Sequence, residues 1–156
     1  MQDADGSYWT TDSELFLGLA GAPEISEWFG YVPSFHDATM NELVIAKDSA
    51  ALSLNAFRMT DRVDDRGYFI LDRHALITVH LSGVTGFSLK GDASSTVFEL
   101  GIRRLESNED AWDTVAGPAP GDWEVRWESA YGVEGAIYAR DLKLTFRPNS
   151  QAATSN

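Results

Sequence analysis

Three side chains that could do chemistry together are crowded into the stretch WFGYVPSFHD, residues 28–37. Ser34, His36 and Asp37 carry a hydroxyl, an imidazole and a carboxylate, the groups of a nucleophilic triad. A triad needs side chains that converge from separate elements, whereas neighbours in an extended chain point to opposite faces. We therefore expect no catalysis here, and predict that His36 and Asp37 tie down a corner that docks the preceding helix. The alternative is a small ligand-binding or hydrolytic domain with a pocket at His36 and Asp37.

The three histidines do not form a metal-binding pattern. His74 and His80 fall in one expected strand, where their spacing corresponds to roughly 20 Å at about 3.3 Å per residue. A single ion holds its ligands within about 2–2.5 Å, so these two histidines cannot chelate together. The chain has no cysteine and no glycine-rich motif for a nucleotide or phosphate. We expect neither a metal nor a cofactor.

A charged segment, MTDRVDDRGYFILDR, residues 59–73, interleaves carboxylates with arginines. Mixed charges at this density are typical of a solvated hairpin loop, although a glycosidase-like pair of carboxylates stays open as an alternative. An aromatic side chain among flexible charges also favours protein binding. We predict that this loop and the later loop of residues 106–122 contact a partner. The candidate residues are Asp61, Asp64, Asp65, Tyr68, Glu109 and Asp110.

One short helix is predicted immediately before the aromatic stretch, in GAPEISEWFG, residues 21–30. Pro23 fits a first helical turn, and Ile25, Trp28 and Phe29 follow at the spacing of one apolar helix face. Gly30 can adopt the left-handed conformation that ends a helix. The preceding segment, residues 13–21, fits either a strand or a short helix.

The rest of the chain is predicted to be strands with short connections. Alternating apolar residues without any βαβ pattern favour a mainly β fold, an antiparallel twisted sheet or sandwich of six to seven strands. We expect a hairpin turn at residues 83–86 and a bulge near Arg140 and Asp141. The predicted division is a single β-rich domain over residues 1–147 and a disordered polar tail over residues 148–156.

The formal net charge of −12 limits the possible partners. Phosphate backbones repel such a chain, so we expect no nucleic-acid binding. The first residues lack the basic and apolar regions of a signal peptide, and no apolar run approaches the roughly 20 residues that cross a bilayer. We expect a cytoplasmic protein without membrane contact, whose acidity serves solubility or attracts a basic partner.

Three stretches together carry a family resemblance: EWFGYVPSFHDA, FRMTDRVDDRGYFILDRHALITVHLSGV and ESAYGVEGAIYARDLKL. They resemble the immunity protein 50 family of bacterial polymorphic toxin systems, over roughly Trp28 to Leu144. The chain departs from the family at Val32, where an aromatic residue is common before the proline, and in the inserted stretch AWDTVAGPAPGD.

The resemblance implies a mainly β protein that neutralises a cognate toxin by stoichiometric occlusion, without chemistry of its own. It supplies no catalytic residues. A basic nuclease toxin would suit the negative charge of the chain, because acidic surfaces raise the rate of association with basic clefts. A third possibility is a structural domain that forms dimers through Trp123 and Trp127 on an exposed sheet face.

Overall fold

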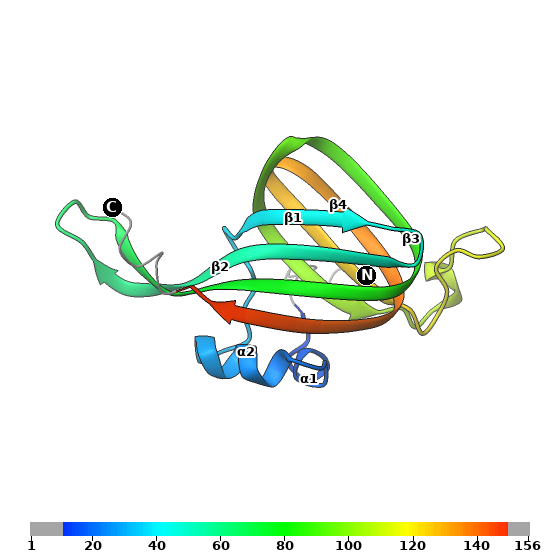
Figure 1. Ribbon diagram of the computed structural model, residues 1–156, viewed down its shortest axis with the longest axis horizontal. Coiled ribbons are helices and arrows are strands. Elements are labelled where there is room, and N and C mark those ends of the chain that lie inside the picture. The colour runs from blue at the N-terminus through cyan, green and yellow to red at the C-terminus, as the bar shows by residue number, and fades with distance from the viewer. Residues whose placement is uncertain (1–10, 150–156) are drawn as a thin grey trace.

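The computed structural model describes residues 11–149, apart from the side chains of residues 93–95, 98, 130 and 131. Two short α-helices precede four long strands, and a single 3-10 turn, η1, interrupts the strands (Figure 1). The elements are α1 (Ser13–Leu17), α2 (Ala22–Phe29), β1 (Thr39–Ile45), β2 (Ser49–Val63), β3 (Phe69–Arg104), η1 (Asn108–Asp110) and β4 (Trp123–Pro148). None of the described helices is long and apolar enough to cross a membrane.

The helices form as their residue types dictate. The side chain of Asp12 accepts a hydrogen bond from the backbone N–H of Leu15, which caps α1; of the ambiguous segment, Ser13–Leu17 are therefore helical. In α2, Ile25 and Phe29 are buried on one face, and Gly30 ends the helix with a φ of 82°. The ring of Trp28 packs against Phe146 of β4, with 6.1 Å between the ring centroids.

The four strands form one antiparallel sheet in the order β1-β2-β3-β4, which confirms the prediction of a mainly β fold. The alternating apolar segments at residues 74–83, 87–91 and 96–104 all belong to the single strand β3. The hairpin turn expected at residues 83–86 is therefore wrong. The chain continues because β4 stays paired with β3 there, and only the register shifts, between Val84 and Gly86.

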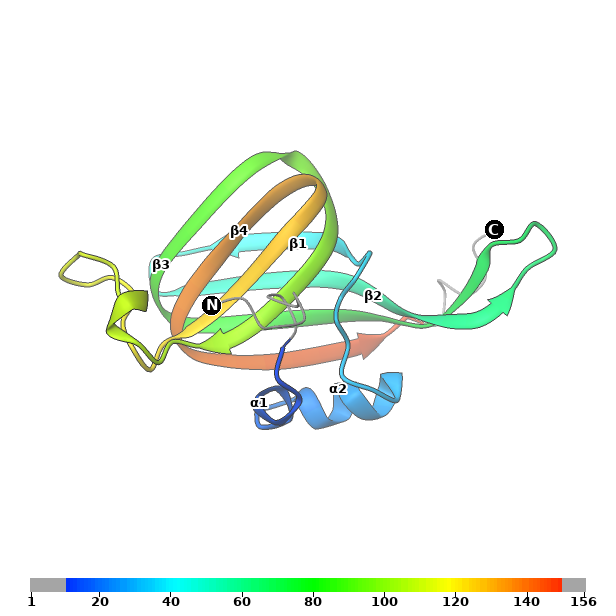
Figure 2. The ribbon, with the colours of Figure 1, turned by 180° about the vertical axis from the view of Figure 1, so that it is seen from behind.

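A long two-stranded ribbon gives the molecule its shape. β3 and β4 pair from Ala75 and Pro148 to Arg104 and Trp123, and the ribbon curls back over the sheet (Figures 1 and 2). Its second half reaches β1, where Thr39 pairs with Thr96. The sheet thus folds over itself, and one main core fills the space that it encloses.

The core contains residues from all the strands and both helices. Its largest fully buried side chains are Trp127, Phe16, Phe29, Ile25, Leu52, Leu54, Ile77, Leu100 and Ile102. The core-facing positions of β4 change phase from Ala139 to Leu142, as expected, but the bulge predicted near Arg140 and Asp141 is wrong. Asp141 and Ala139 pair in regular register with Ser82 and Val84, and the nearest register shift lies on β3, between Val84 and Gly86. The predicted tail begins later than expected, because Pro148 pairs with Ala75 and Asn149 donates to His74; residues 150–156 lie outside the described part.

Candidate functional site

Backbone hydrogen bonds build the corner at His36 and Asp37. Phe35 and Asp37 have φ angles of 61° and 63°, and the side chain of Phe35 is buried. The N–H of Asp37 donates to the carbonyl of Val97, and the N–H of His36 donates to Ser34 Oγ. His36 Nε2 lies 3.5 Å from Asp37 Oδ2, so the expectation that these neighbouring side chains point apart is wrong. The positive φ of Asp37 removes the extended geometry on which it rested.

A small hollow of about 130 Å³ lies beside this corner, between the chain that follows α2 and strand β2. The residues that line it are Tyr31, Pro33, Ser34, Phe35, His36, Ala56, Phe57 and Met59. Most of these side chains are apolar. The side chains of His36 and Asp37 are each 46% exposed, so solvent reaches both groups. The hollow therefore suits an apolar group better than a shielded reaction centre.

The other histidines are held apart by the strands that carry them. The ring of His74 packs against Phe57, with 6.0 Å between centroids. His80 Nε2 lies 2.8 Å from Thr145 Oγ1 on β4. Among residues 11–149, no three His, Asp or Glu side chains are grouped so that they could hold a metal ion.

The charged segment of the sequence forms a hairpin that protrudes from the body, at the end of β2 and the start of β3 (Figures 1 and 2). We call residues 58–73 the arm. At its base, Arg58 donates two hydrogen bonds to Asp72, of 2.8 and 2.7 Å. These hydrogen bonds lower the pKa of the Asp72 carboxyl, and the positive charge of Arg58 lowers it further. The arm carries four arginines and four aspartates, so its formal charge is zero.

One face of the arm is apolar and exposed. Met59 pairs with Leu71 and Val63 pairs with Phe69, and paired residues share a face of a β-ribbon. Phe69 and Leu71 lie two residues apart on one strand, so all four belong to the same face. Met59, Val63 and Phe69 are 48%, 55% and 56% exposed. At the tip, Asp64 Oδ1 accepts from the N–H groups of Arg66 and Tyr68, which fixes the turn.

The six predicted contact residues do not form one surface. Asp61, Asp64, Asp65 and Tyr68 lie on the arm, whereas Glu109 and Asp110 lie in η1 at the opposite end of the molecule (Figure 1). Asp110 also makes structural contacts: its carboxylate accepts a hydrogen bond from the N–H of Ser107 and lies 3.3 Å from the guanidinium of Arg103.

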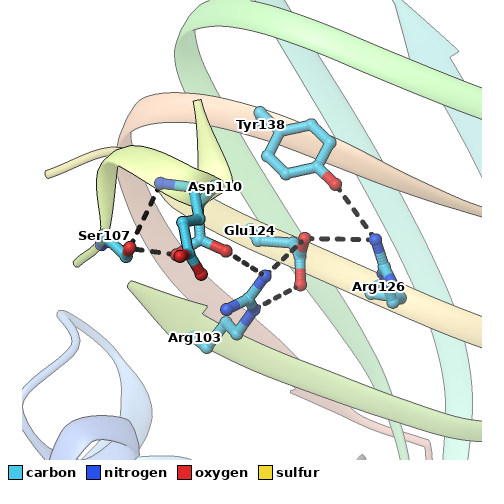
Figure 3. A network of polar contacts seen from close by, with 7 residues as sticks. Arg103, Ser107, Asp110, Glu124, Arg126 and Tyr138 are labelled. Carbon is cyan, nitrogen blue, oxygen red and sulfur yellow. Dashed lines mark hydrogen bonds and ion pairs between the residues drawn. The ribbon is translucent and has the colours of Figure 1, made fainter. Parts of the chain in front are cut away.

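An ionic network surrounds the buried Glu124 of β4, and no motif in the sequence indicates it. Glu124 is only 2% exposed; its carboxylate accepts from Arg103 and lies 3.4 Å from Arg126 (Figure 3). Arg126 in turn donates to the hydroxyl of Tyr138. Burial raises the pKa of the Tyr138 phenol, and its hydrogen bond with Glu124 raises it further. The network neutralises its own charges and joins η1 to the ribbon.

The ribbon also encloses a cleft of about 370 Å³ beside this network. Its lining combines small, charged and aromatic residues: Ser88, Lys90, Arg126, Trp127, Glu128, Glu134, Gly135 and Ala136. Trp127 is buried, and the guanidinium of Arg104 covers the ring of Trp123 at 5.0 Å. The two tryptophans therefore do not present the exposed face that a dimer through them would require.

Comparison with known proteins does not identify a functional site in this chain. No family model, no curated protein and no solved structure matches the chain. Of the surfaces described, the arm combines exposed apolar side chains with protrusion from the body, and it is the candidate functional site.

Proposed function

We propose that this chain is a stoichiometric antidote that binds a bacterial toxin and blocks it, with the arm as its contact surface. The observation that carries the proposal is the apolar face of the arm, where Met59, Val63 and Phe69 are each about half exposed. Apolar patches of this kind on a protein surface mark sites that a partner covers. Burial of each such side chain contributes up to about 1.5–3 kcal/mol, so a few anchors sustain a complex.

The arm is also built to hold this face in place. Its two strands are hydrogen-bonded along the base, Arg58 and Asp72 cross-link them, and Asp64 organises the turn. A surface that is ordered before binding loses less conformational entropy when it binds. The alternative of a hydrolytic pocket lacks comparable support, because the hollow is mainly apolar and Ser34 Oγ accepts a backbone hydrogen bond.

The test is co-expression with the product of the adjacent gene, as the candidate toxin, followed by pull-down and a growth assay. We expect an equimolar complex that rescues growth. Phe69→Ser should weaken the complex by about tenfold or more, because an exposed anchor is removed without disturbing the core. The matched control is Val115→Ser, a fully exposed apolar side chain near η1, which should change nothing.

Two results would count against the proposal. Absence of both a complex and growth rescue would refute the antidote function. A Phe69→Ser variant that binds as tightly as the unmodified chain would show that the arm is not the contact surface.

A further inference from the structure

At the base of the arm, one edge of β2 is not paired with another described strand. β1 pairs with β2 only as far as Thr39 opposite Asn55, and β2 then continues to Val63 with β3 on its other side. The chain ahead of β1 turns away because Asp37 and Ala38 exchange hydrogen bonds with Val97. Among the described residues, no strand pairs with β2 beyond Asn55 on the side of β1. Such an edge is a template for another strand.

The hollow beside the corner lies along this same stretch of β2. Ala56, Phe57 and Met59 form one wall, and the segment from Tyr31 to His36 forms the other. Its volume of about 130 Å³ and its largely apolar lining suit a large apolar side chain. The apolar face of the arm continues from Met59, so the hollow and the face adjoin.

The charge of the arm limits what can occupy this edge. Its four arginines and four aspartates balance, and Arg58 and Asp72 at the base satisfy each other. A strongly charged segment would therefore gain little electrostatic attraction and would leave apolar surface uncovered. An extended, uncharged, apolar segment matches the site.

We propose that the arm recognises its partner by strand addition: an uncharged extended segment of the partner pairs with β2 at the base of the arm and inserts one large apolar side chain into the hollow. This inference rests on the proposed function and names the binding mode of the same surface. Backbone hydrogen bonds would supply affinity, and the hollow would supply specificity. The ladder between β2 and β3 shifts register within this stretch, between Ala56 and Arg58, and again between Met59 and Val63. The second shift limits the added strand to the few residues of β2 that precede it.

A phage-displayed library of random short peptides, selected on the intact chain, tests the inference without knowledge of the toxin. We expect the selected peptides to share one large apolar residue within an extended, uncharged sequence. Replacing that residue by alanine should lower affinity about tenfold or more in calorimetric titration. Methylation of the peptide's backbone nitrogens that face β2 should have a similar effect, because it removes the donors of the added strand.

Two variants locate the site. Met59→Asp places a charge at the rim of the hollow and should abolish peptide binding. Val44→Asp is the control, because Val44 on β1 is 47% exposed and Met59 is 48% exposed. Both positions face solvent, and circular dichroism checks that each variant keeps its fold.

The peptide experiments would overturn the inference in three ways: by peptides without a common apolar residue, by peptides that bind Met59→Asp as well as the original chain, or by tolerance of backbone methylation. Sedimentation that reveals dimers lost in Met59→Asp would also overturn it, by making a second copy the occupant of the edge. If the toxin complex still depends on Phe69 while these tests fail, the antidote function stands and only the strand-addition mode is wrong.

Discussion

The ion pair between Arg58 and Asp72 contributes to the stability of the fold at the base of the arm. Because the pKa of Asp72 is lower in the folded chain than its ordinary value, the carboxylate stabilises the fold above its unfolded pKa of about 3.9. That stabilisation is lost as the pH falls through the lower folded value.

Asp72→Asn should therefore lower the urea midpoint at neutral pH and have a diminishing effect as the pH falls below about 4. The measurement is urea unfolding of both proteins over an acidic pH series. Asp65→Asn is the control, since Asp65 is an exposed acid near the tip of the arm. A difference between Asp72→Asn and the original chain that persisted unchanged into strong acid would contradict the assigned ion pair.

At single positions, the sequence predicted burial well where one face of a strand meets the core. Apolar and charged residues alternate from Trp123 to Trp127, and Val125 and Trp127 on the apolar face are buried. Glu124, which the alternation places on the charged face with Arg126, is buried as well, because Arg103 and the loop that carries Asp110 and Trp112 pack on that face. The alternation of apolar and polar residues indicates on which face of a strand a side chain lies, but not whether a loop distant in the sequence covers that face. The network around Glu124 therefore could not be predicted.

At the scale of elements, glycines control how α2 docks on the sheet. Gly21 precedes α2 with a φ of 87°, and a Cβ atom there would overlap the carbonyl oxygen of Leu144. Ala20 meets β4 at the same place, where its carbonyl accepts from the N–H of Leu144.

Gly21→Ala should destabilise the protein by about 3 kcal/mol or more, from backbone strain and the clash with β4 together. Gly67→Ala separates these two causes, because Gly67 at the tip of the arm has a φ of 85° but open space around it. We expect a loss of only about 1–2 kcal/mol for Gly67→Ala. Urea unfolding measures both. Equal losses in the two variants would show that contact with Leu144 does not fix α2.

Element type was more predictable than element length. The apolar face and glycine boundary of α2 are local signals, and both strand parity and antiparallel pairing follow from alternation. The continuation of β3 through residues 83–86 could not be predicted, because Gly83 and Gly86 give the same local signal in a turn and in a bent strand. Only the continuous pairing with β4 distinguishes the two.

For the whole molecule, an acidic loop and the proposed apolar contact surface lie apart. The arm is formally neutral, whereas the loop of residues 105–122 has five acids and neither lysine nor arginine. The two lie at opposite ends of the molecule (Figure 2). If the partner is a basic toxin, the electrostatic field of the whole chain should determine the association rate, and the contacts of the arm should determine the dissociation rate.

Neutralising three exposed acids of that loop, Glu106→Gln, Glu109→Gln and Asp113→Asn together, should therefore slow association with the candidate toxin about two- to tenfold at low salt. Dissociation should not change. Phe69→Ser should do the reverse, since loss of an anchor acts mainly on dissociation. Surface plasmon resonance resolves both rates.

At high salt, where charges beyond a Debye length of about 3–10 Å are screened, the loop variant should associate like the original chain. Faster dissociation of the loop variant would instead place Glu109 and its neighbours in the interface, as the sequence first predicted.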